Sequence, residues 1–342
     1  MRPMPSHPMH LKFRFSPWRL ALQVWPCLLA PASHAAPADD AATSYPTRQI
    51  TLIVPTAAAG GTDTVARLFA PALAQLLKQP VLVENKPGAN GILGADAVAH
   101  APPDGHKLLF AYAAAMVVNP SLYRKLPYDT LRDFVPVVQI GRGGNLLLVR
   151  SDMPVKTLQD FVAYAKARPG QLSYCSWGAG SGGHLAMESL SRQAGLQMTH
   201  VPYKGTAPCV QDLLGGQVNA AFADTTSTVE LVKAGKLRPL VNSGPARLPL
   251  MPDVPTMNEA GHPFTTYAWY GLFAPAGTPD AIVHKLNRVV NQLIQDPAIR
   301  RRMNELNTNE MQSNTPEDFA ATIRQDLKDW GQLVRQTGVV LD

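Results

Sequence analysis

Two strand-to-helix turns, each built from glycine and other small residues, constrain the fold of this chain more than any other feature. The first covers residues 56–63 after the β-branched run 50–54, and the second covers residues 176–184 after the run 172–176. Such a turn exposes backbone N–H groups at a helix N-terminus, where the helix dipole favours an anion. Two of them, about 120 residues apart, predict two lobes that hold one small anionic ligand.

Strand and helix signals alternate through most of the chain. The predicted strands 50–54, 81–84 and 107–111 are separated by helical patterns over residues 64–77 and 92–100. This order predicts an α/β fold with a mostly parallel sheet, right-handed crossovers and flanking helices. We expect Asp63 to be the N-cap of the first helix. A second series of the same kind has predicted strands at 172–176, 199–201, 220–223 and 237–241, and helices after Thr157–Asp160 and at 185–194, 207–214 and 229–234.

The chain is expected to cross between the lobes twice. The strands 135–140 and 146–150 flank Gly141-Arg142-Gly143-Gly144, and the strand 269–274 follows a proline-rich segment and returns. Helices 281–295 and 319–336 close the chain, the second behind an N-cap at Thr315. The predicted organisation is a signal peptide (1–35), a linker (36–44), a discontinuous first lobe (45–142 and 268–342) and a second lobe (143–267).

The N-terminus is typical of a secretory leader. It carries four basic residues and no acidic residue before Asp39, then an apolar stretch over residues 20–30 and the small residues Ser33 and Ala35. This pattern predicts export to the periplasm with cleavage near Ala35. The formal charge of +6 is therefore misleading, because four of the 31 Lys and Arg residues lie in the leader. The rest of the chain is nearly neutral, which argues against binding to nucleic acid.

Two cysteines remain after the predicted cleavage, Cys175 and Cys209. Two cysteines are too few for a fold held together by disulfides, and a hydrophobic core of this size is stable without them. An oxidising periplasm would allow them to pair. We expect free thiols, because pairing requires Cα atoms within about 7 Å and suitably directed side chains.

The second turn also matches parts of two enzyme motifs. Residues 178–183 satisfy the dinucleotide pattern G-x-G-x-x-G, but the next strand end, His200–Tyr203, lacks the acidic residue that holds a ribose. Ser181 and His184 suggest a hydrolase, but the nucleophile motif G-x-S-x-G lacks its first glycine. We expect no enzymatic activity, no metal and no cofactor, since no third ligand accompanies His184 and Glu188.

Several motifs, in order along the chain, carry a family resemblance. They include Gly60-Gly61-Thr62-Asp63, Leu126-Pro127-Tyr128-Asp129 and Val201-Pro202-Tyr203-Lys204-Gly205. Further matches lie at residues 45–55, 83–89, 103–105, 119–123, 169–174, 212–216 and 234–238. Over residues 45–342 the chain resembles the Bug-type, or TctC-like, solute-binding proteins of tripartite tricarboxylate transporters.

The resemblance implies a two-lobed periplasmic-binding-protein fold of type II-like architecture, with the ligand in the cleft between the lobes. It implies a monomer that holds a small carboxylate, largely through backbone amides and bridging waters, and delivers it to integral-membrane transporter subunits. The ligand-binding residues that we expect are Thr56, Ala57, Gly60, Gly61, Thr62 and Asp63; Ala113; Trp177, Gly178, Ala179, Gly180, Ser181 and His184; and Tyr203, Lys204, Gly205, Thr206, Asp224 and Thr225.

The chain departs from the family pattern inside the expected pocket. The family usually has an aromatic residue in place of Thr56 and hydroxyl residues in place of Ala113 and Ala114. It usually has a small polar residue in place of Trp177 and often asparagine in place of Ala179. The indole is able to stack on an aromatic carboxylate or to pack between the lobes. The choice among aliphatic, aromatic and amino-acid carboxylates stays open. So does a second role, in which a periplasmic sensory component presents the ligand to a receptor kinase.

Overall fold

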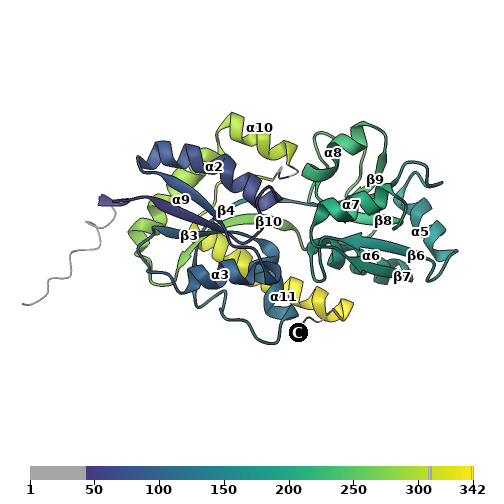
Figure 1. Ribbon diagram of the computed structural model, residues 1–342, viewed down its shortest axis with the longest axis horizontal. Helices are drawn as coiled ribbons and strands as arrows, with labels where there is room; N and C mark the ends of the chain where they lie inside the picture. The colour runs from purple at the N-terminus through teal and green to yellow at the C-terminus, as the bar shows by residue number, and fades with distance from the viewer. Residues whose placement is uncertain (1–43, 307, 309, 340, 342) are drawn as a thin grey trace, which may run out of the picture. The chain divides into compact units, whose positions relative to one another are not determined.

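The structure is a computed structural model that describes residues 44–306, 308, 310–339 and 341. The predicted signal peptide lies outside the described residues. Two mixed sheets, each flanked by helices, make up the described part of the chain (Figure 1). None of the described helices combines the length and the apolar character that a membrane span requires.

Each sheet has four strands that share a direction and one reversed strand. The first contains β1 (Ile50–Val54), β2 (Val81–Asn85), β3 (Lys107–Tyr112), β4 (Phe134–Gly143) and β10 (Ala268–Pro275) in the order β2-β1-β3-β10-β4. The second contains β5 (Leu146–Arg150), β6 (Leu172–Ser176), β7 (Met198–Pro202), β8 (Ala220–Ala223) and β9 (Leu237–Asn242) in the order β7-β6-β8-β5-β9. The reversed strands are β10 and β5, which are the first strands after each crossing. The α/β prediction is confirmed, and the crossings explain why the sheets are mixed.

Helices cover both faces of each sheet (Figure 1). One face of the first sheet packs on α2 (Gly61–Leu77), α9 (Asp280–Ile294) and α10 (Pro297–Glu305). The other face packs on α3 (Ile92–Ala99), α4 (Asn119–Leu122) and α11 (Pro316–Thr337). The second sheet packs on α7 (Thr206–Leu214) and α8 (Thr225–Lys233), and on its other face on α5 (Leu158–Lys166) and α6 (Gly182–Ala194).

In the interior strands the side chains alternate between the two faces of the sheet, and both faces are buried. Leu146 and Leu148 of β5 join the core beneath α7, whereas Leu147 and Val149 join the core beneath α5 and α6. All four are fully buried. This explains why the strands read as continuous apolar runs, as expected for sheets covered on both sides.

The first long helix begins earlier than the sequence predicts. Asp63 is not the N-cap of α2; the helix begins at Gly61, and Gly60 is the N-cap. Glycine and threonine are weak helix formers, so the local pattern hides this first turn. By contrast, the predicted N-cap at Thr315 is confirmed, since Thr315 and Asp318 form a reciprocal capping box.

Four short segments, which include α4, were not predicted. A 3₁₀ turn, η1 (Ala89–Gly91), precedes α3, and a π-helical turn, η2 (Ala114–Val118), precedes α4. The helix α10 begins at Pro297 behind the N-cap Asp296, whose carboxylate accepts the N–H groups of Ala298 and Ile299.

Cys175 and Cys209 form a disulfide, so the expectation of free thiols was wrong. Their Cα atoms are 5.6 Å apart, which is inside the range that a disulfide requires. Cys175 lies in β6 and Cys209 in α7, and both side chains are fully buried. The parallel pairing of β6 with β7 places α7, which follows β7, beside Cys175.

Candidate functional site

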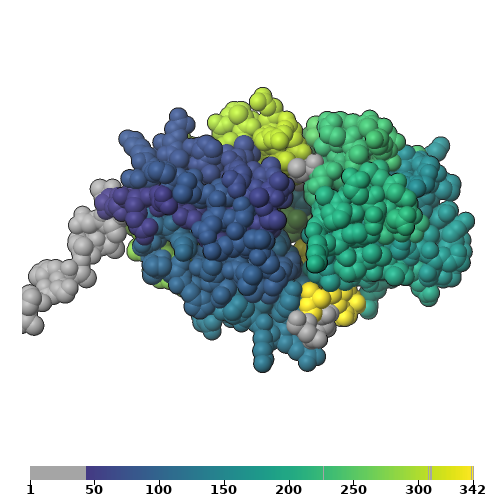
Figure 2. All heavy atoms as spheres, viewed as in Figure 1, coloured from purple at the N-terminus to yellow at the C-terminus, as the bar shows by residue number. Residues whose placement is uncertain are grey.

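The predicted site residues lie where strands end and helices begin. β1 leads into α2, β6 into α6, β7 into α7 and β8 into α8, and Ala113 lies between β3 and η2. These are carboxyl ends of parallel strands, where open α/β sheets bind ligands. On the face shown in Figure 2, a furrow separates the purple atoms of the first turn from the green atoms of α7 and α8.

The first turn presents an uncapped helix N-terminus. Among the described residues no side chain caps α2, and its N-cap Gly60 is extended. Ala57 is exposed, Gly60 and Gly61 are half-buried, and Thr62 is buried. The N–H groups of the first helical turn therefore point out of the helix without a side-chain acceptor, which suits an anion.

Asp63 holds the first turn from within. Its carboxylate accepts the N–H of Ala59 at 2.8 Å, the guanidinium of Arg67 at 2.9 Å and the amide of Asn85 at 2.9 Å. Asn85 also donates to the carbonyl oxygen of Thr56 at 3.0 Å. Burial raises the pKa of Asp63, but these hydrogen bonds outweigh it and hold that pKa below its ordinary value. Asp63 therefore orders the turn.

The second turn is ordered by two serines. Ser181 is the N-cap of α6, and its hydroxyl accepts the N–H of His184. Ser176 donates to the carbonyl oxygen of Gly178 at 2.8 Å. Gly178 and Gly180 have φ of +152° and +72°, values that favour glycine. Ala179 is half-buried between them.

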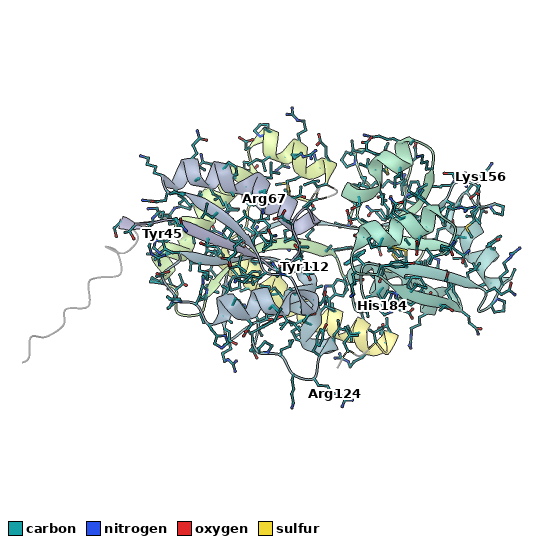
Figure 3. The ribbon with its side chains drawn as sticks, in the orientation of Figure 1. Tyr45, Arg67, Tyr112, Arg124, Lys156 and His184 are labelled. Atoms are coloured by element: carbon teal, nitrogen blue, oxygen red, sulfur yellow. A yellow bond between two sulfur atoms is a disulfide. The ribbon has the colours of Figure 1, made fainter. Side chains whose placement is uncertain are left out.

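His184 fixes the backbone of this turn (Figure 3). Its Nδ1 atom accepts the N–H of Gly180 at 3.0 Å, so the ring proton is assigned to Nε2. The ring stacks on His200, and His200 stacks on Tyr174. Burial lowers the pKa of both imidazoles to about 4, and for His184 the charge of His200 adds to this effect. Both rings are therefore neutral near pH 7.

We predicted that Gly180 contacts the ligand. Its backbone N–H already donates a hydrogen bond to Nδ1 of His184, so this N–H is not free to bind a ligand. A Cβ added at Gly180 would lie 2.5 Å from Leu122 Cδ1 and 3.0 Å from Leu341 Cδ1. Leu122 ends α4, which packs on the first sheet, so the second turn is in contact with residues of the other lobe. Gly180 is required for this approach and for its positive φ.

Trp177 covers the start of α6. A Cβ on Gly183 would lie 2.5 Å from Cζ3 of the indole, and one on Gly182 would lie 3.6 Å from Cζ2. The indole therefore lies against the first turn of α6, while the residue stays half-buried. This side of the second turn is apolar, unlike the uncapped first turn.

The predicted site residues between β7 and α7 differ in whether their polar groups are free to bind a ligand. The Tyr203 hydroxyl donates to Asp212, and Lys204 is exposed. Gly205, with φ +119°, is the N-cap of α7, which has no side-chain cap and begins at Thr206.

The start of α8 is capped but holds one unpaired hydroxyl. The Asp224 carboxylate accepts the N–H of Ser227 at 2.9 Å. Thr225 is 1% exposed, and its Oγ1 has no hydrogen-bond partner within the described chain. The Thr56 Oγ1 atom in the first turn is likewise buried without a described partner.

Sequence reasoning missed two polar groups near these turns. Asn85 is the last residue of β2 and lies opposite Val54 of β1. Asn85 would have been predicted as a neighbour of the first turn if the pairing of β1 with β2 had been worked out. Tyr270 lies in β10, and its hydroxyl oxygen would be 2.9 Å from a Cβ on Gly61. No local pattern marks Tyr270, because only the return of the chain brings it to α2.

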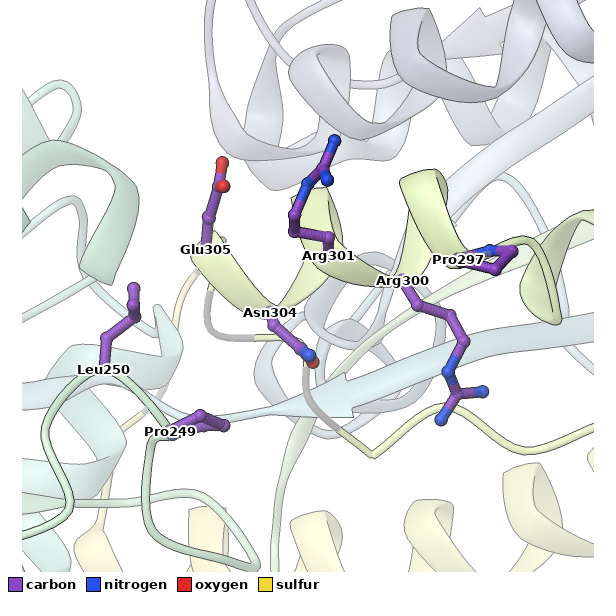
Figure 4. A pocket seen from close by; sticks show the side chains of 7 residues that line it. All are labelled: Pro249, Leu250, Pro297, Arg300, Arg301, Asn304 and Glu305. Atoms are coloured by element: carbon purple, nitrogen blue, oxygen red, sulfur yellow. The ribbon is translucent and has the colours of Figure 1, made fainter.

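Two pockets lie elsewhere. One, of about 490 Å³, lies between α10 and the loop that carries Pro249 and Leu250 (Figure 4). The other, of about 260 Å³, is lined by residues that include Arg150 and Tyr164. None of the predicted site residues lines either pocket. Within the described residues, no group of His, Cys, Asp and Glu side chains is arranged to hold a metal ion.

This chain has the architecture of a two-lobed α/β protein of the periplasmic-binding type. It has two sheets, two crossings between them, and helix N-termini at the sheet edges. The chain belongs to the TctC family, described as the tripartite tricarboxylate transporter family receptor, whose model matches residues 65–339. It is 36% identical to protein BugT of Bordetella pertussis over 315 residues, covering 92% of this chain and 96% of that protein. Members of this family are solute-binding proteins.

Two solved structures with bound carboxylates are similar to this chain. One is the R. palustris protein Rpa4515 with adipate, at 34% identity and a TM-score of 0.80, covering 86% of this chain and 99% of that one. The other is MatC of Rhodopseudomonas palustris with bound malate, at 36% identity and a TM-score of 0.75, covering 85% and 100%.

Proposed function

We propose that this chain is a periplasmic solute-binding protein that captures a small carboxylate between two lobes and delivers it to membrane subunits of a tripartite transporter. The lobes comprise residues 45–142 with 268–342, and residues 143–267. The chain acts as a monomer, without enzymatic activity.

One observation carries the proposal: α2 begins with N–H groups that no side chain of the described chain caps, in a turn that is ordered by hydrogen bonds of Asp63 and Asn85. Such a site favours an anion. Hydrogen bonds to a charged group contribute about 1.5–3 kcal/mol each. Four or five of them, from the helix N-termini of the two turns, would support micromolar binding, about −8 kcal/mol, after the cost of association.

The ligands bound to related proteins support a small carboxylate as the class of solute. Adipate and malate are small dicarboxylates, and both names come from structures that align with more than four-fifths of this chain. Trp177, which covers the start of α6, makes that side of the second turn apolar. We therefore expect a carboxylate with one anionic end at α2 and a less polar part toward Trp177.

A thermal-shift screen followed by calorimetry tests the binding role. The panel is malate, adipate, citrate, glutamate and benzoate, with the matched uncharged amides as controls. We expect at least one carboxylate to bind in the micromolar range or tighter, and its amide to bind far more weakly. Failure of every carboxylate to bind would overturn the proposal.

Export and delivery need separate tests. N-terminal sequencing of protein from the periplasmic fraction is expected to begin near Ala36. In a deletion strain, uptake of the radiolabelled ligand should fall. Unchanged uptake together with lost ligand-dependent transcription would favour the sensory role instead.

A further inference from the structure

The hydroxyl of Tyr270 lies at the start of α2, although the residue belongs to the strand that returns from the second sheet. A Cβ built on Gly61, the first residue of α2, would be 2.9 Å from the Tyr270 oxygen. Gly61 is thus small enough to let the phenol approach the helix N-terminus. Tyr270 itself is half-buried in β10, where it pairs with Tyr112 and Gly141.

This hydroxyl has no hydrogen-bond partner within the described chain. The fully buried tyrosines have partners within the chain: Tyr45 donates to the Gly105 carbonyl, Tyr128 to the Ala115 carbonyl and Tyr174 to Glu188. A buried tyrosine usually finds a partner for its hydroxyl, because an unpaired polar group loses its hydration without compensation. The Tyr270 hydroxyl at the start of α2 is therefore available to a partner from outside the chain.

We propose that Tyr270 is a ligand-contacting residue whose hydroxyl donates a hydrogen bond to the carboxylate held at the N-terminus of α2. The inference rests on the proposed function and adds a side-chain donor to the backbone N–H groups of the first turn. A phenol has one donor hydrogen, so it favours a charged acceptor such as a carboxylate oxygen over an amide nitrogen, which is itself a donor.

The protonation state of Tyr270 suits this role. Burial, and then the negative charge of Asp224, raise the pKa of the phenol above its ordinary value. The hydroxyl therefore keeps its proton throughout the physiological range and is always a donor. At the start of α8, the buried Thr225 hydroxyl likewise has no described partner.

The substitution Tyr270→Phe tests the proposal, because it removes the hydroxyl and keeps the ring. The control is Tyr267→Phe, three residues earlier, which removes a hydroxyl that accepts a hydrogen bond from Asn258. Calorimetry with malate, adipate, citrate, glutamate and benzoate identifies the best wild-type ligand, which then probes both variants. We expect Tyr270→Phe to weaken binding about tenfold or more, and Tyr267→Phe to leave it within twofold.

A second variant links the effect to α2. Gly61→Ala places a methyl group against the hydroxyl, so it should weaken binding in the wild type but have much less effect in the Tyr270→Phe background. Additive effects, or Tyr270→Phe binding as tightly as wild type, would overturn this inference and leave the proposed function intact. If the wild type binds none of the five carboxylates, the proposed function and the inference fail together.

Discussion

The imidazole of His184 lies flat on that of His200, with ring centroids 3.7 Å apart and planes inclined by 10°. His184 belongs to α6 and His200 to β7, and His184 also accepts the N–H of Gly180. His200 in turn lies 2.8 Å from the Ser176 hydroxyl. The pair therefore connects both ends of the second turn to the adjacent strand.

Replacing His184 with alanine should loosen this turn. The Gly180 N–H loses its acceptor, and leaving a buried donor unpaired costs about 1–3 kcal/mol. We expect this loss in the free energy of unfolding, measured with urea, and weaker ligand binding. His184→Asn supplies an oxygen near the position of Nδ1 and should recover part of both effects. Equal losses for the two variants would show that the hydrogen bond to Gly180 is unimportant.

The histidine pair should also make stability depend on pH. The pKa of each imidazole is about 4 in the folded protein, compared with about 6.5 in the unfolded chain. Between these values the unfolded chain binds more protons, so the free energy of unfolding falls as the pH drops from 6.5 to 4. The double variant His184→Asn/His200→Gln should lose this part of the pH dependence. An unchanged slope in urea titrations would contradict the prediction.

Asp326 should change the pH dependence of the free energy of unfolding in the opposite direction to the histidine pair. Its carboxylate accepts the indole N–H of Trp269 at 2.6 Å. Burial raises its pKa to about 6, Asp329 adds to the increase, and Trp269 and Arg142 oppose it. The folded protein thus retains a proton between pH 4 and 6 that the unfolded chain releases, and stability falls as the pH rises through this interval.

The variant Asp326→Asn removes that charge and keeps an acceptor for Trp269. Relative to wild type, we expect it to gain about 1–3 kcal/mol in the free energy of unfolding between pH 4 and 6, with no further change above pH 7. Urea titrations at pH 4, 6 and 8 measure this difference. A variant that is less stable than wild type at pH 8 would show that the charge of Asp326 is needed beside Arg142.

The disulfide should make a large contribution to the stability of the second lobe. It closes a segment with a sequence separation of 34, for which the chain-entropy estimate is about 4 kcal/mol. Cys175→Ala/Cys209→Ala should therefore lower the free energy of unfolding by about 2–4 kcal/mol. Thiol titration of unfolded, unreduced protein that lacks the leader should detect no thiol. Two thiols per chain would contradict the pairing.

Much of the fold was predictable because both sheets are covered on both faces. The apolar runs 50–54, 146–150, 172–176 and 220–223 coincide with the bounds of β1, β5, β6 and β8. Glycine-rich helix starts were harder to predict, since the beginning of α2 at Gly61 has no side-chain signal. The π-helical turn after β3 was missed for a similar reason: Ala114–Val118 is uniformly apolar and has no distinguishing period.

The two turns could be predicted from the sequence, but the hydrogen bonds that order them could not. Asp63 reads as a cap, yet it orders its turn through Arg67 and Asn85, and Asn85 belongs to another strand. Tyr270 is more than 200 residues from Gly61 in sequence. Contacts of this kind depend on strand order and register, which local propensity does not encode.

The placement of β10 has a consequence for the order in which the chain folds. β10 lies between β3 and β4, so the first sheet lacks an interior strand until residue 275 has been released. The second sheet has all its strands once residue 242 is available. The later segment of the chain is therefore able to fold first, the reverse of the usual N-to-C order. Until then β4 has no partner in its own sheet, and its unpaired edges are open to aggregation.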